Sequence, residues 1–490
     1  MVDSSFWAWI VPVSIIVIDT VIRVVALFVV PRNRTPASGT AWLVVILLLP
    51  IPGLIFFLLI GGNRMPRARR ERQNRVAAEM TNFGRGEKES AEYDVHALRP
   101  GVDRAVELGM ALGAQPMLGG NTASISHVYE ESVAHIAAGI REAREFVHIE
   151  FYILSYDKTT ADVFEAIREV TARGVVVRVL IDHIASVRQP GLKTTTRMLE
   201  EAGATWAFML PVRPWRKQWQ RPDLRNHRKL VVVDGVTGFM GSQNLIDSSY
   251  NKPGNIKRGL HWRDIFVRFN GPVVAGINAV FIGDWYVETG EVIAERSSRR
   301  QVAAQSGHLG CQVLPSGPGF GDENNLQVFL ALIHAANRRI SITSPYFVPD
   351  QAIMYALRAA SARGVAVELF VSETGDQPLV YHAQRSYYGE LIDSGVRIFM
   401  FKPPYILHSK HLSIDDDVAV IGSSNMDQRS FNLNAEVSMI VSGEDFVRDL
   451  DAVNAYYHEN SRELTRDEWS KQPVRAQLLD GLARLSSALQ

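Results

Sequence analysis

Two copies of one short motif carry residue types that are suited to chemistry on a phosphate ester. The pattern His-x-Lys-x-x-x-x-Asp spans residues 227–234 and recurs at residues 408–415. Each copy is followed by Gly-Ser-x-Asn, at residues 241–244 and 422–425, and the histidine precedes that glycine by 14 residues in both copies. A chain that repeats its reactive histidine with the same spacing predicts one site that contains both histidines.

A site with two histidines and two lysines can move a phosphoryl group in two steps. One neutral imidazole attacks phosphorus and forms a phosphohistidine. The other imidazole, protonated, donates to the leaving alkoxide and then takes a proton from the incoming hydroxyl. Because these roles need opposite protonation states, we expect the two environments to push the pKa values apart. The lysines would neutralise the non-bridging oxygens, a task that a metal ion performs elsewhere, so no metal and no other cofactor is expected.

Each motif is predicted to form a β-hairpin. In the first copy, His227 and Lys229 project from one face of a strand, because side chains alternate between faces. A two-residue turn that begins at Asp234 sets Ser242 opposite His227 and places Asn244 on the same face. The first repeat therefore offers His, Lys, Ser and Asn side chains from one patch, a cluster suited to holding a phosphate.

The second copy is predicted to follow the same pattern, with Ser423 opposite His408. Its turn at residues 415–417 lacks glycine, so a longer loop there would shift the register. The candidate phosphate-binding residues of the two copies are Lys229, Ser242, Asn244, Lys410, Ser423 and Asn425. The motif aspartates, Asp234 and Asp415, lie at the turns, where such side chains favour hydrogen bonds to the backbone over chemistry.

A carboxylate follows each motif at a matching place. Asp264 and Glu436 each begin an apolar, strand-like run, and a glycine stands seven residues further on in both cases. An acid repeated at this place is a candidate to accept the Nδ1 proton of a motif histidine and so orient the ring. An ordinary acid at the start of a strand is the alternative.

The paired motif resembles that of the phospholipase D superfamily, and nearly the whole chain is similar to the bacterial cardiolipin synthases within it. The similarity includes Trp-Arg-Asp at residues 262–264, the run Asn-Met-Asp-Gln-Arg-Ser at residues 425–430, and Asn-Ala-Glu at residues 434–436. The resemblance implies a catalytic set of His227, Lys229, Asp234, His408, Lys410 and Asp415, with Asp264 and Glu436 orienting the histidines. It also implies that His227 is the nucleophile and His408 the general acid and base, although the symmetry of the motifs leaves that order open.

Internal symmetry extends beyond the motifs. Ala-Arg-Gly-Val precedes a predicted strand at residues 172–175 and again at residues 362–365. Strands alternate with helices in each half, which is typical of α/β layers. We expect an α/β fold of two duplicated phospholipase D-like α/β/α lobes about a pseudo-two-fold axis, because only that arrangement brings both patches to one cleft. The expected units are a transmembrane hairpin (1–62), a basic juxtamembrane segment and linker (63–120), a first repeat (121–305), and a second repeat with a C-terminal amphipathic helix (306–490).

Two apolar runs near the start, at residues 6–30 and 42–60, predict two transmembrane helices. Their 25 and 19 residues compare with the roughly 20 that cross a bilayer. Asp19 and Arg23 are spaced to pair within the first span. Proline and glycine at residues 50–53 break the second run, so a kinked or re-entrant helix is the alternative there. A cleaved signal peptide is disfavoured, because the first five residues include no basic residue.

Basic residues predict the orientation of these spans. The loop between the two runs carries only Arg32 and Arg34. The arginines after the second run are Arg64, Arg67, Arg69, Arg70, Arg72 and Arg75. By the positive-inside rule, the chain from residue 63 onward faces the cytoplasm, and the protein is expected in the bacterial inner membrane. Contact of these arginines with anionic head groups is the alternative to a plain topology signal.

Two further segments are candidates for membrane contact. Residues 213–225 interleave tryptophan with arginine and lysine, which suits the interfacial zone of an anionic bilayer, although a surface that stacks single-stranded nucleic acid would look similar. Near the end, leucines recur at helical spacing on one predicted face. They are Leu478, Leu482, Leu485 and Leu489. Docking of this helix on the core is the preferred interpretation, and insertion into the membrane interface is the alternative.

Length and composition agree with a large enzyme. The chain has 490 residues, 47% of them hydrophobic, and a formal net charge of zero, so no global charge attraction to nucleic acid is indicated. Cys311 is the only cysteine, which excludes an internal disulfide. An active cleft held at a membrane meets lipid phosphodiesters at high local concentration.

The expected function is that of a membrane-anchored phosphatidyltransferase. It would move phosphatidyl from one phosphatidylglycerol to the hydroxyl of a second and release glycerol, with phosphatidylglycerol and other anionic lipids as partners and no nucleic acid. A phospholipase D that uses water or another alcohol as acceptor is the alternative, and a nuclease is a third candidate. A non-catalytic lipid-binding scaffold is disfavoured, because binding alone does not need two histidines.

Overall fold

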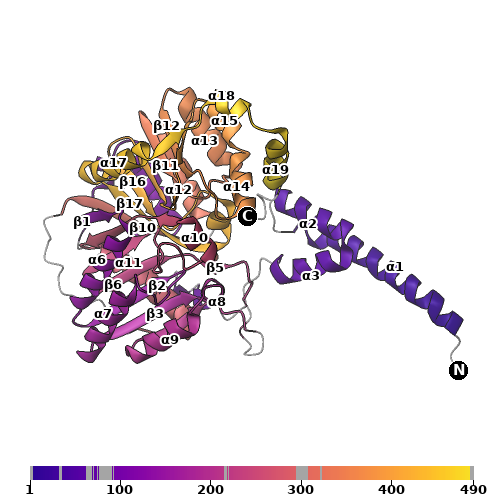
Figure 1. The fold of residues 1–490 in the computed structure, drawn as a ribbon, viewed down its shortest axis with the longest axis horizontal. Helices are drawn as coiled ribbons and strands as arrows, with labels where there is room; N and C mark the ends of the chain where they lie inside the picture. Colours follow the sequence, from indigo (N-terminus) through magenta and orange to yellow (C-terminus); the bar gives the residue numbers. More distant parts are fainter. Residues whose placement is uncertain are drawn as a thin grey trace.

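The computed structural model describes residues 4–32, 36–61, 69, 71–73, 75–76, 91, 93–213, 218, 220–293, 307–320 and 323–485 of the 490-residue chain. A large α/β body carries both motifs, and helix α1 (Ser4–Val29) projects from one side of it (Figure 1). Two further short helices, α2 (Pro36–Leu48) and α3 (Pro50–Ile60), lie between α1 and the body.

One continuous β-sheet runs through the body, and its strand order repeats on either side of a central pair. That pair is β1 (Leu118–Ser126) and β10 (Leu309–Ser316), which run antiparallel. Outward from β1, the first lobe contains β9 (Phe266–Asn270), β7 (Thr237–Gly241), β6 (Lys229–Val233), β2 (Phe146–Phe151), β3 (Val176–Asp182) and β4 (Thr205–Met209). Outward from β10, the second lobe contains β17 (Asn434–Ser442), β16 (Val418–Gly422), β15 (His411–Ile414), β11 (Arg339–Thr343), β12 (Ala366–Ser372), β13 (Arg397–Phe401) and β18 (Ser461–Glu463). The matching order confirms a duplicated α/β lobe, and antiparallel pairing of equivalent strands is what a two-fold axis between them produces.

Helices cover both faces of the sheet in each lobe. Those of the first lobe are α6 (Tyr129–Arg141), α7 (Ala161–Ala172), α8 (His183–Val187), α9 (Leu192–Glu201), α10 (Pro253–Arg258) and α11 (Val273–Thr289). Those of the second lobe are α12 (Asn324–Ala335), α13 (Gln351–Ala362), α14 (Pro378–Arg385), α15 (Tyr388–Asp393), α16 (Gln428–Asn432), α17 (Glu444–Glu459), α18 (Arg466–Ser470) and α19 (Val474–Leu485). The turn η1 (Val95–Ala97) and helix α5 (Val102–Ala111) precede β1, and α5 packs on α12.

The apolar core continues from one lobe into the other. In α7 the buried side chains Val163, Ile167 and Val170 recur every three or four residues, as expected of a helix with one face on a sheet. Helix α11 is instead buried along most of its length, because it contacts strands of its own lobe and also β10. Phe281 from α11 and Phe370 from the second lobe belong to one core cluster. The two lobes therefore fold as one packed unit.

The register of the motif hairpins differs from the prediction by one residue. Strand β6 pairs Val233 with Thr237, so three residues, not two, form the turn, and Ser242 does not lie opposite His227. The second hairpin has the same three-residue turn, which likewise moves the partner of His408 away from Ser423. In the first hairpin the register shifts because Val236 is an extra residue: Asp234 and Gly235 both have positive φ and the amide of Val236 donates to the carbonyl of Val233 at 3.0 Å, as in a tight turn, yet Val233 pairs with Thr237.

The glycine of each Gly-Ser-x-Asn segment is required by close packing of backbones. A Cβ at Gly241 would collide with the carbonyl oxygen of Ile265, and one at Gly422 would collide with that of Val437. These carbonyls directly follow Asp264 and Glu436 in the chain. The glycines therefore let the strand that carries each acid lie against the end of the motif hairpin.

Within the described residues, only α1 contains a segment long enough to cross a membrane, at Val11–Val29. Its predicted ion pair is present, with Arg23 Nε 2.9 Å from Asp19 Oδ2. The second apolar run, expected as one span, is divided into α2 and α3 at Leu49, where Pro50 begins a new helix. With a rise of about 1.5 Å per residue, their 13 and 11 residues each fall short of the roughly 30 Å hydrocarbon core. A straight second span is therefore absent from this described segment.

The arginines after the apolar segment contact the body where they are described. Arg69 pairs with Glu288 at 2.7 Å, and Arg72 donates to the carbonyl of Val287 at 3.0 Å. Both contacts lie at the C-terminal end of α11, where positive charge complements the helix dipole. Arg64, Arg67 and Arg70 lie outside the described residues.

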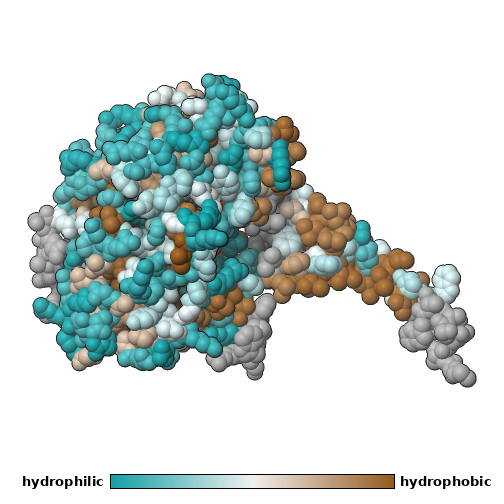
Figure 2. All heavy atoms as spheres, in the orientation of Figure 1, coloured by the Kyte–Doolittle hydropathy of each residue, from teal (hydrophilic) through white to brown (hydrophobic). Residues whose placement is uncertain are grey.

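The C-terminal helix docks on the second lobe, but not through its leucines. Asp480 of α19 accepts from His382 Nδ1 at 2.6 Å, and Arg484 pairs with Glu390 at 2.7 Å. Leu478 and Leu482 are 63% and 64% exposed, so the prediction that the leucine face packs on the core is wrong. The apolar face of α19 lies on the same side of the molecule as the apolar surface of α1 (Figure 2). Leu489 lies outside the described residues.

Candidate active site

A short parallel strand pair brings the first histidine to the second lobe. Strand β5 (Arg225–Asn226) ends immediately before His227 and pairs with β17, with Asn226 level with Ala435. The amide of His227 donates to the carbonyl of Ala435 at 2.8 Å. Because the next residue of β17 is Glu436, this register places the histidine of the first lobe beside the acid of the second lobe.

The second histidine reaches the first lobe in the same way. Strand β14 (Tyr405–Leu407) ends immediately before His408 and pairs in parallel with β8 (His261–Arg263). The amide of His408 donates to the carbonyl of Arg263 at 2.6 Å, and the residue that follows Arg263 is Asp264. The two lobes thus exchange histidines across their interface.

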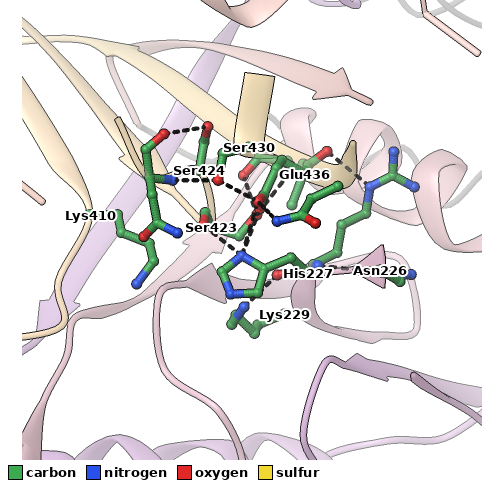
Figure 3. Close-up of polar contacts among 12 residues, drawn as sticks. Asn226, His227, Lys229, Lys410, Ser423, Ser424, Ser430 and Glu436 are labelled. Atoms are coloured by element: carbon green, nitrogen blue, oxygen red, sulfur yellow. Dashed lines mark hydrogen bonds and ion pairs between the residues drawn. The ribbon is translucent and has the colours of Figure 1, made fainter. Parts of the chain in front are cut away.

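The imidazole of His227 is held by a carboxylate of the other lobe. Its Nδ1 lies 3.0 Å from both oxygens of Glu436. Ser423 and Ser430 donate to the same carboxylate at 2.5 and 2.9 Å, so the acid is fixed from several directions. Figure 3 shows Glu436 and Ser423 above the imidazole, with the side chains of Lys229 and Lys410 on its other sides.

The second histidine has an equivalent support. His408 Nδ1 lies 2.7 Å from Asp264 Oδ1, and Ser242 donates to that same oxygen at 2.6 Å. Burial raises the pKa of Asp264 and of Glu436, but the histidine and lysine that face each carboxylate outweigh it, so both pKa values lie below normal. Both acids are therefore ionised acceptors at neutral pH. With Nδ1 committed on each ring, Nε2 is the nitrogen left to react.

Both imidazoles have lowered pKa values. Burial lowers the pKa of His227 to about 4, against the raising effect of Glu436. Burial also lowers the pKa of His408, against the raising effect of Asp264. The lysine of the other lobe contributes to each shift, which places all four side chains in one electrostatic environment.

Both motif lysines are buried without a carboxylate partner. Lys229 is fully buried and donates to the carbonyl of His227, with Nζ 5.3 Å from the ring centre of Tyr152. Lys410 is 2% exposed and lies 2.6 Å from the carbonyl of His408 and 3.2 Å from its Nε2. Among the residues that the structure describes, neither ammonium forms an ion pair with an acid. Two such groups at one place favour an anionic ligand between them.

The predicted phosphate ligands separate into two groups. Ser242 and Ser423 each direct their single hydroxyl proton at a carboxylate, so their hydroxyls support the acids, and the prediction that they donate to phosphate is revised. Asn244 donates to the hydroxyl of Tyr250 at 2.8 Å and accepts from the amide of Ile153. The side-chain oxygen of Asn425 is buried with no hydrogen-bond partner in the described part of the chain. Lys229 and Lys410 are thus the donors left for a phosphate, whereas the unpartnered atom of Asn425 is an acceptor, which does not hydrogen-bond a phosphate oxygen.

The motif aspartates lie away from the histidines, at the hairpin turns. Asp234 accepts from the amides of Arg144, Glu145 and Phe146, each at 2.8 Å. Asp415 accepts from the amides of Asn337, Arg338 and Arg339. Each fastens its hairpin to the start of a neighbouring strand of the same lobe. This geometry favours the backbone role expected of a turn aspartate over a catalytic one.

Two tyrosines beside the histidines were not anticipated from the sequence. The ring of Tyr152 meets that of His227 edge-on with centres 4.9 Å apart, and Tyr346 meets His408 edge-on at 6.2 Å. Each follows the first parallel strand of its lobe, β2 or β11. They stand outside the repeated motifs, so the motif spacing gave no signal for them.

A duplicated α/β lobe that places one buried His-Lys pair on each side of a shared anion site is the arrangement of a two-lobed phosphotransfer enzyme. The family profile described as "Cardiolipin synthase, PLD-like domain" matches residues 136–257 and 329–455, and the "Phospholipase_D-nuclease N-terminal" profile matches residues 21–62. Cardiolipin synthase A of Pseudomonas putida is 33% identical over 469 residues, 95% of each chain. Cardiolipin synthase of Geobacillus kaustophilus is 32% identical over 474 residues, 95% of this chain and 91% of that protein.

The fold is also that of a solved enzyme. Phosphatidylserine synthase of Haemophilus influenzae superposes with a TM-score of 0.60 at 17% identity, over 79% of this chain and 98% of that one. The chain belongs to the cardiolipin synthase family of phospholipase D-like proteins, and it is a phospholipid phosphatidyltransferase of that superfamily.

Replacing Asp234 separates its structural role from a catalytic one. Asp234→Ala removes the acceptor of three amides, and we expect the unfolding free energy to fall by about 1–3 kcal/mol. Turnover below the unfolding temperature should persist, because no histidine contacts this side chain. Thermal unfolding and phosphodiester turnover in detergent would measure both, with the exposed Asp449→Ala as control. A loss of turnover of about a hundredfold or more in folded protein would instead assign Asp234 to the chemistry.

The rate should fall in alkali because Lys410 loses its proton. Burial lowers the pKa of Lys410 to about 8, so its ammonium is charged below that pH and neutral above it. We expect kcat/KM, which reports ionisations of the free enzyme, to decrease about tenfold per pH unit above pH 8. The pH profile of the residual activity of Lys410→Met should lack this decrease above pH 8. A wild-type profile that stays flat to about pH 9.5 would show that the charge on Lys410 is not needed.

Proposed function

We propose that the protein forms cardiolipin from two molecules of phosphatidylglycerol and releases glycerol, through a phosphohistidine on His227. The observation that carries this proposal is the crossed pairing of each histidine with an acid of the other lobe, around two buried lysines that have no acidic partner. Such a site supplies a nucleophile, an acid–base group and fixed positive charge for one phosphodiester.

In the first step, Nε2 of His227 attacks the phosphorus of the donor lipid. The bond between phosphorus and the glycerol oxygen breaks, and protonated His408 gives its proton to that oxygen as glycerol leaves. Burial lowers the pKa of His227 to about 4, which keeps its ring neutral and so supports its assignment as the nucleophile. Its Nδ1 proton stays on the ring and is donated to the carboxylate of Glu436, whose charge stabilises the ring as phosphorus bonds to it.

In the second step, a glycerol hydroxyl of another phosphatidylglycerol attacks the phosphohistidine. His408, now neutral, takes the hydroxyl proton as the new phosphorus–oxygen bond forms. The phosphorus–nitrogen bond breaks and returns its electron pair to His227. The enzyme ends with His408 protonated, as it began.

Transfer to an alcohol is favoured over hydrolysis by the enclosure of the site. His227 and His408 are 7% and 4% exposed, and a dry site protects a reactive phosphoryl intermediate from water. A phospholipase D that uses water or another alcohol as acceptor remains the alternative function, because the same residues would serve it.

The protein is membrane-associated, and we propose that its body sits on the cytoplasmic face. Helix α1 spans the bilayer, and α2 and α3 enter it as a re-entrant pair, since each is too short to cross. Gly53 allows these two helices to pack closely, because a Cβ there would lie 2.9 Å from the Cα of Ile46. The exposed leucine face of α19 lies in the interface beside them, which gives the body a second attachment.

Incubation of the full-length protein with phosphatidylglycerol vesicles tests the reaction. Mass spectrometry should detect cardiolipin and glycerol in equal amounts, and added glycerol should lower the cardiolipin yield by reversing the transfer. Phosphatidic acid as the sole lipid product would contradict the proposal and assign the protein as a hydrolase.

Variants of the two histidines extend that test. His227→Ala and His408→Ala should each reduce turnover by about a thousandfold or more, whereas the exposed His96→Ala should not. With phosphate-labelled lipid, the label should remain covalently bound to His408→Ala and be absent from His227→Ala. Labelling of His227→Ala alone would reverse the order of the two histidines.

A fluorescent probe tests the attachment of α19. The only cysteine, Cys311, is buried, so an environment-sensitive dye can be placed at Leu482→Cys in the full-length protein. In phosphatidylglycerol vesicles, we expect this dye to be quenched by lipids that carry a quencher on the acyl chain. The control is Asp449→Cys on α17, which lies on the far side of the body from α1 (Figure 1). Equal, weak quenching at both positions would show that α19 does not meet the bilayer.

A further inference from the structure

The order of bond making and breaking fixes where the alcohol must lie. When Nε2 of His227 attacks phosphorus, the leaving oxygen departs from the opposite side, next to His408. The incoming hydroxyl of the second step approaches along the same line. The glycerol head group of the donor and that of the acceptor therefore occupy one place in turn, on the side of His408. This step rests on the proposed function.

A recess in the second lobe lies on that side of the site. It is partly open to solvent and is lined by Tyr346, Ser372, Thr374 and Asp376, among others. Tyr346 stands between the recess and the acid–base histidine, because its ring meets that of His408 edge-on with centres 6.2 Å apart.

Asp376 is the charged group of the recess. Both oxygens of its carboxylate accept from the hydroxyl of Tyr346, at 3.0 and 3.1 Å, and Gln377 donates to that hydroxyl at 3.1 Å. Asp376 also acts across the cleft: burial lowers the pKa of Lys410, while the charge of Asp376 is among those that raise it. The same charge contributes to the raised pKa of Tyr250 in the first lobe, for which burial is the main cause. Its charge therefore acts on groups of the shared site.

A carboxylate beside a phosphate site repels a further anion and suits a neutral polyol. One hydrogen-bonded hydroxyl leaves most lone pairs of a carboxylate open, so Asp376 can still accept from neighbouring hydroxyls. Thr374 adds a hydroxyl that can donate or accept. A glycerol head group offers two adjacent hydroxyls that match this set.

At the equivalent strand end of the first lobe, the carboxylate is already engaged. Strand β3 ends at Asp182, which is fully buried and already accepts from Arg225 at 2.9 Å and from the amide of Asn226 at 3.0 Å. Its counterpart β12 ends at Ser372, beside the partly exposed Asp376. The motifs are symmetric, but of these two strand ends it is that of β12 that has a carboxylate with spare acceptor capacity beside it.

We propose that Asp376, positioned by Tyr346, binds the glycerol head group and selects glycerol over water as the acceptor. It acts on both half-reactions, because the leaving and the incoming glycerol use the same subsite. Asp376 is a specificity-determining residue and takes no part in proton transfer.

Asp376→Asn tests this subsite in full-length protein with phosphatidylglycerol vesicles. We expect the ratio of cardiolipin to phosphatidic acid to fall about tenfold, the effect of losing a hydrogen bond to a charged group. The glycerol concentration that halves cardiolipin accumulation should rise by a similar factor. Release of p-nitrophenol from a phosphatidyl p-nitrophenyl ester should be retained, because that leaving group needs neither the subsite nor a proton.

Two further variants make the result decisive. Tyr346→Phe leaves the carboxylate of Asp376 in place but removes the hydrogen bond that positions it, so it should shift the product ratio in the same direction. Asp449→Asn should leave the ratio unchanged. A wild-type product ratio in Asp376→Asn overturns the subsite, as does an equal loss of cardiolipin formation and p-nitrophenol release. Absence of cardiolipin with the wild-type protein would overturn the proposed function itself, and the subsite with it.

Discussion

The site depends on two short parallel strand pairs that cross between the lobes. In one pair, β14 ends just before His408 and β8 ends just before Asp264. In the other pair, β5 ends just before His227 and β17 passes through Glu436. Backbone hydrogen bonds fix the register, so the histidine and the acid arrive side by side without help from long, flexible side chains. A slip of one residue would turn the acid to the other face of its strand. The distance between Nδ1 and the carboxylate is thus set by the backbone, which is the most rigid part of the protein.

This crossing explains why the two lobes act as one catalytic unit. Neither lobe holds a complete histidine–acid pair, so separation of the lobes would leave two buried carboxylates without their partners, at a high cost in free energy. The residue between His227 and Lys229 strengthens the same interface, because Arg228 donates to the carbonyl of Glu436 at 2.9 Å. Its counterpart Ser409 instead bonds within its own lobe, to the hydroxyl of Tyr457 at 2.7 Å. The apolar core shared through α11 then supplies the bulk of the contact that keeps these registers in place.

The repeated motif allowed the duplicated fold and the shared site to be predicted, because it fixes which residues must meet. It did not fix the partners within the site. Two acids and two histidines permit pairing within a lobe or between lobes, and the strand register that decides it involves residues with no distinctive sequence pattern. The hairpin turn was predicted one residue too short, because the Asp234–Gly235 turn forms but Val236, which follows it, is an extra residue with no signal in the sequence. The break in the second apolar run at Pro50 could be predicted as an alternative, because proline ends a helix. The docking of α19 through Asp480 could not be predicted, because it depends on a partner distant in the sequence, His382.

The lowered pKa values of both imidazoles follow mainly from burial, to which the two motif lysines add and which the carboxylates of Asp264 and Glu436 oppose. A proton on either buried ring is therefore costly in the protein alone. A phosphodiester brings one negative charge into the same space, and an opposite charge nearby favours the protonated form of an imidazole. Binding of substrate thus helps to create the general acid that its own leaving group requires.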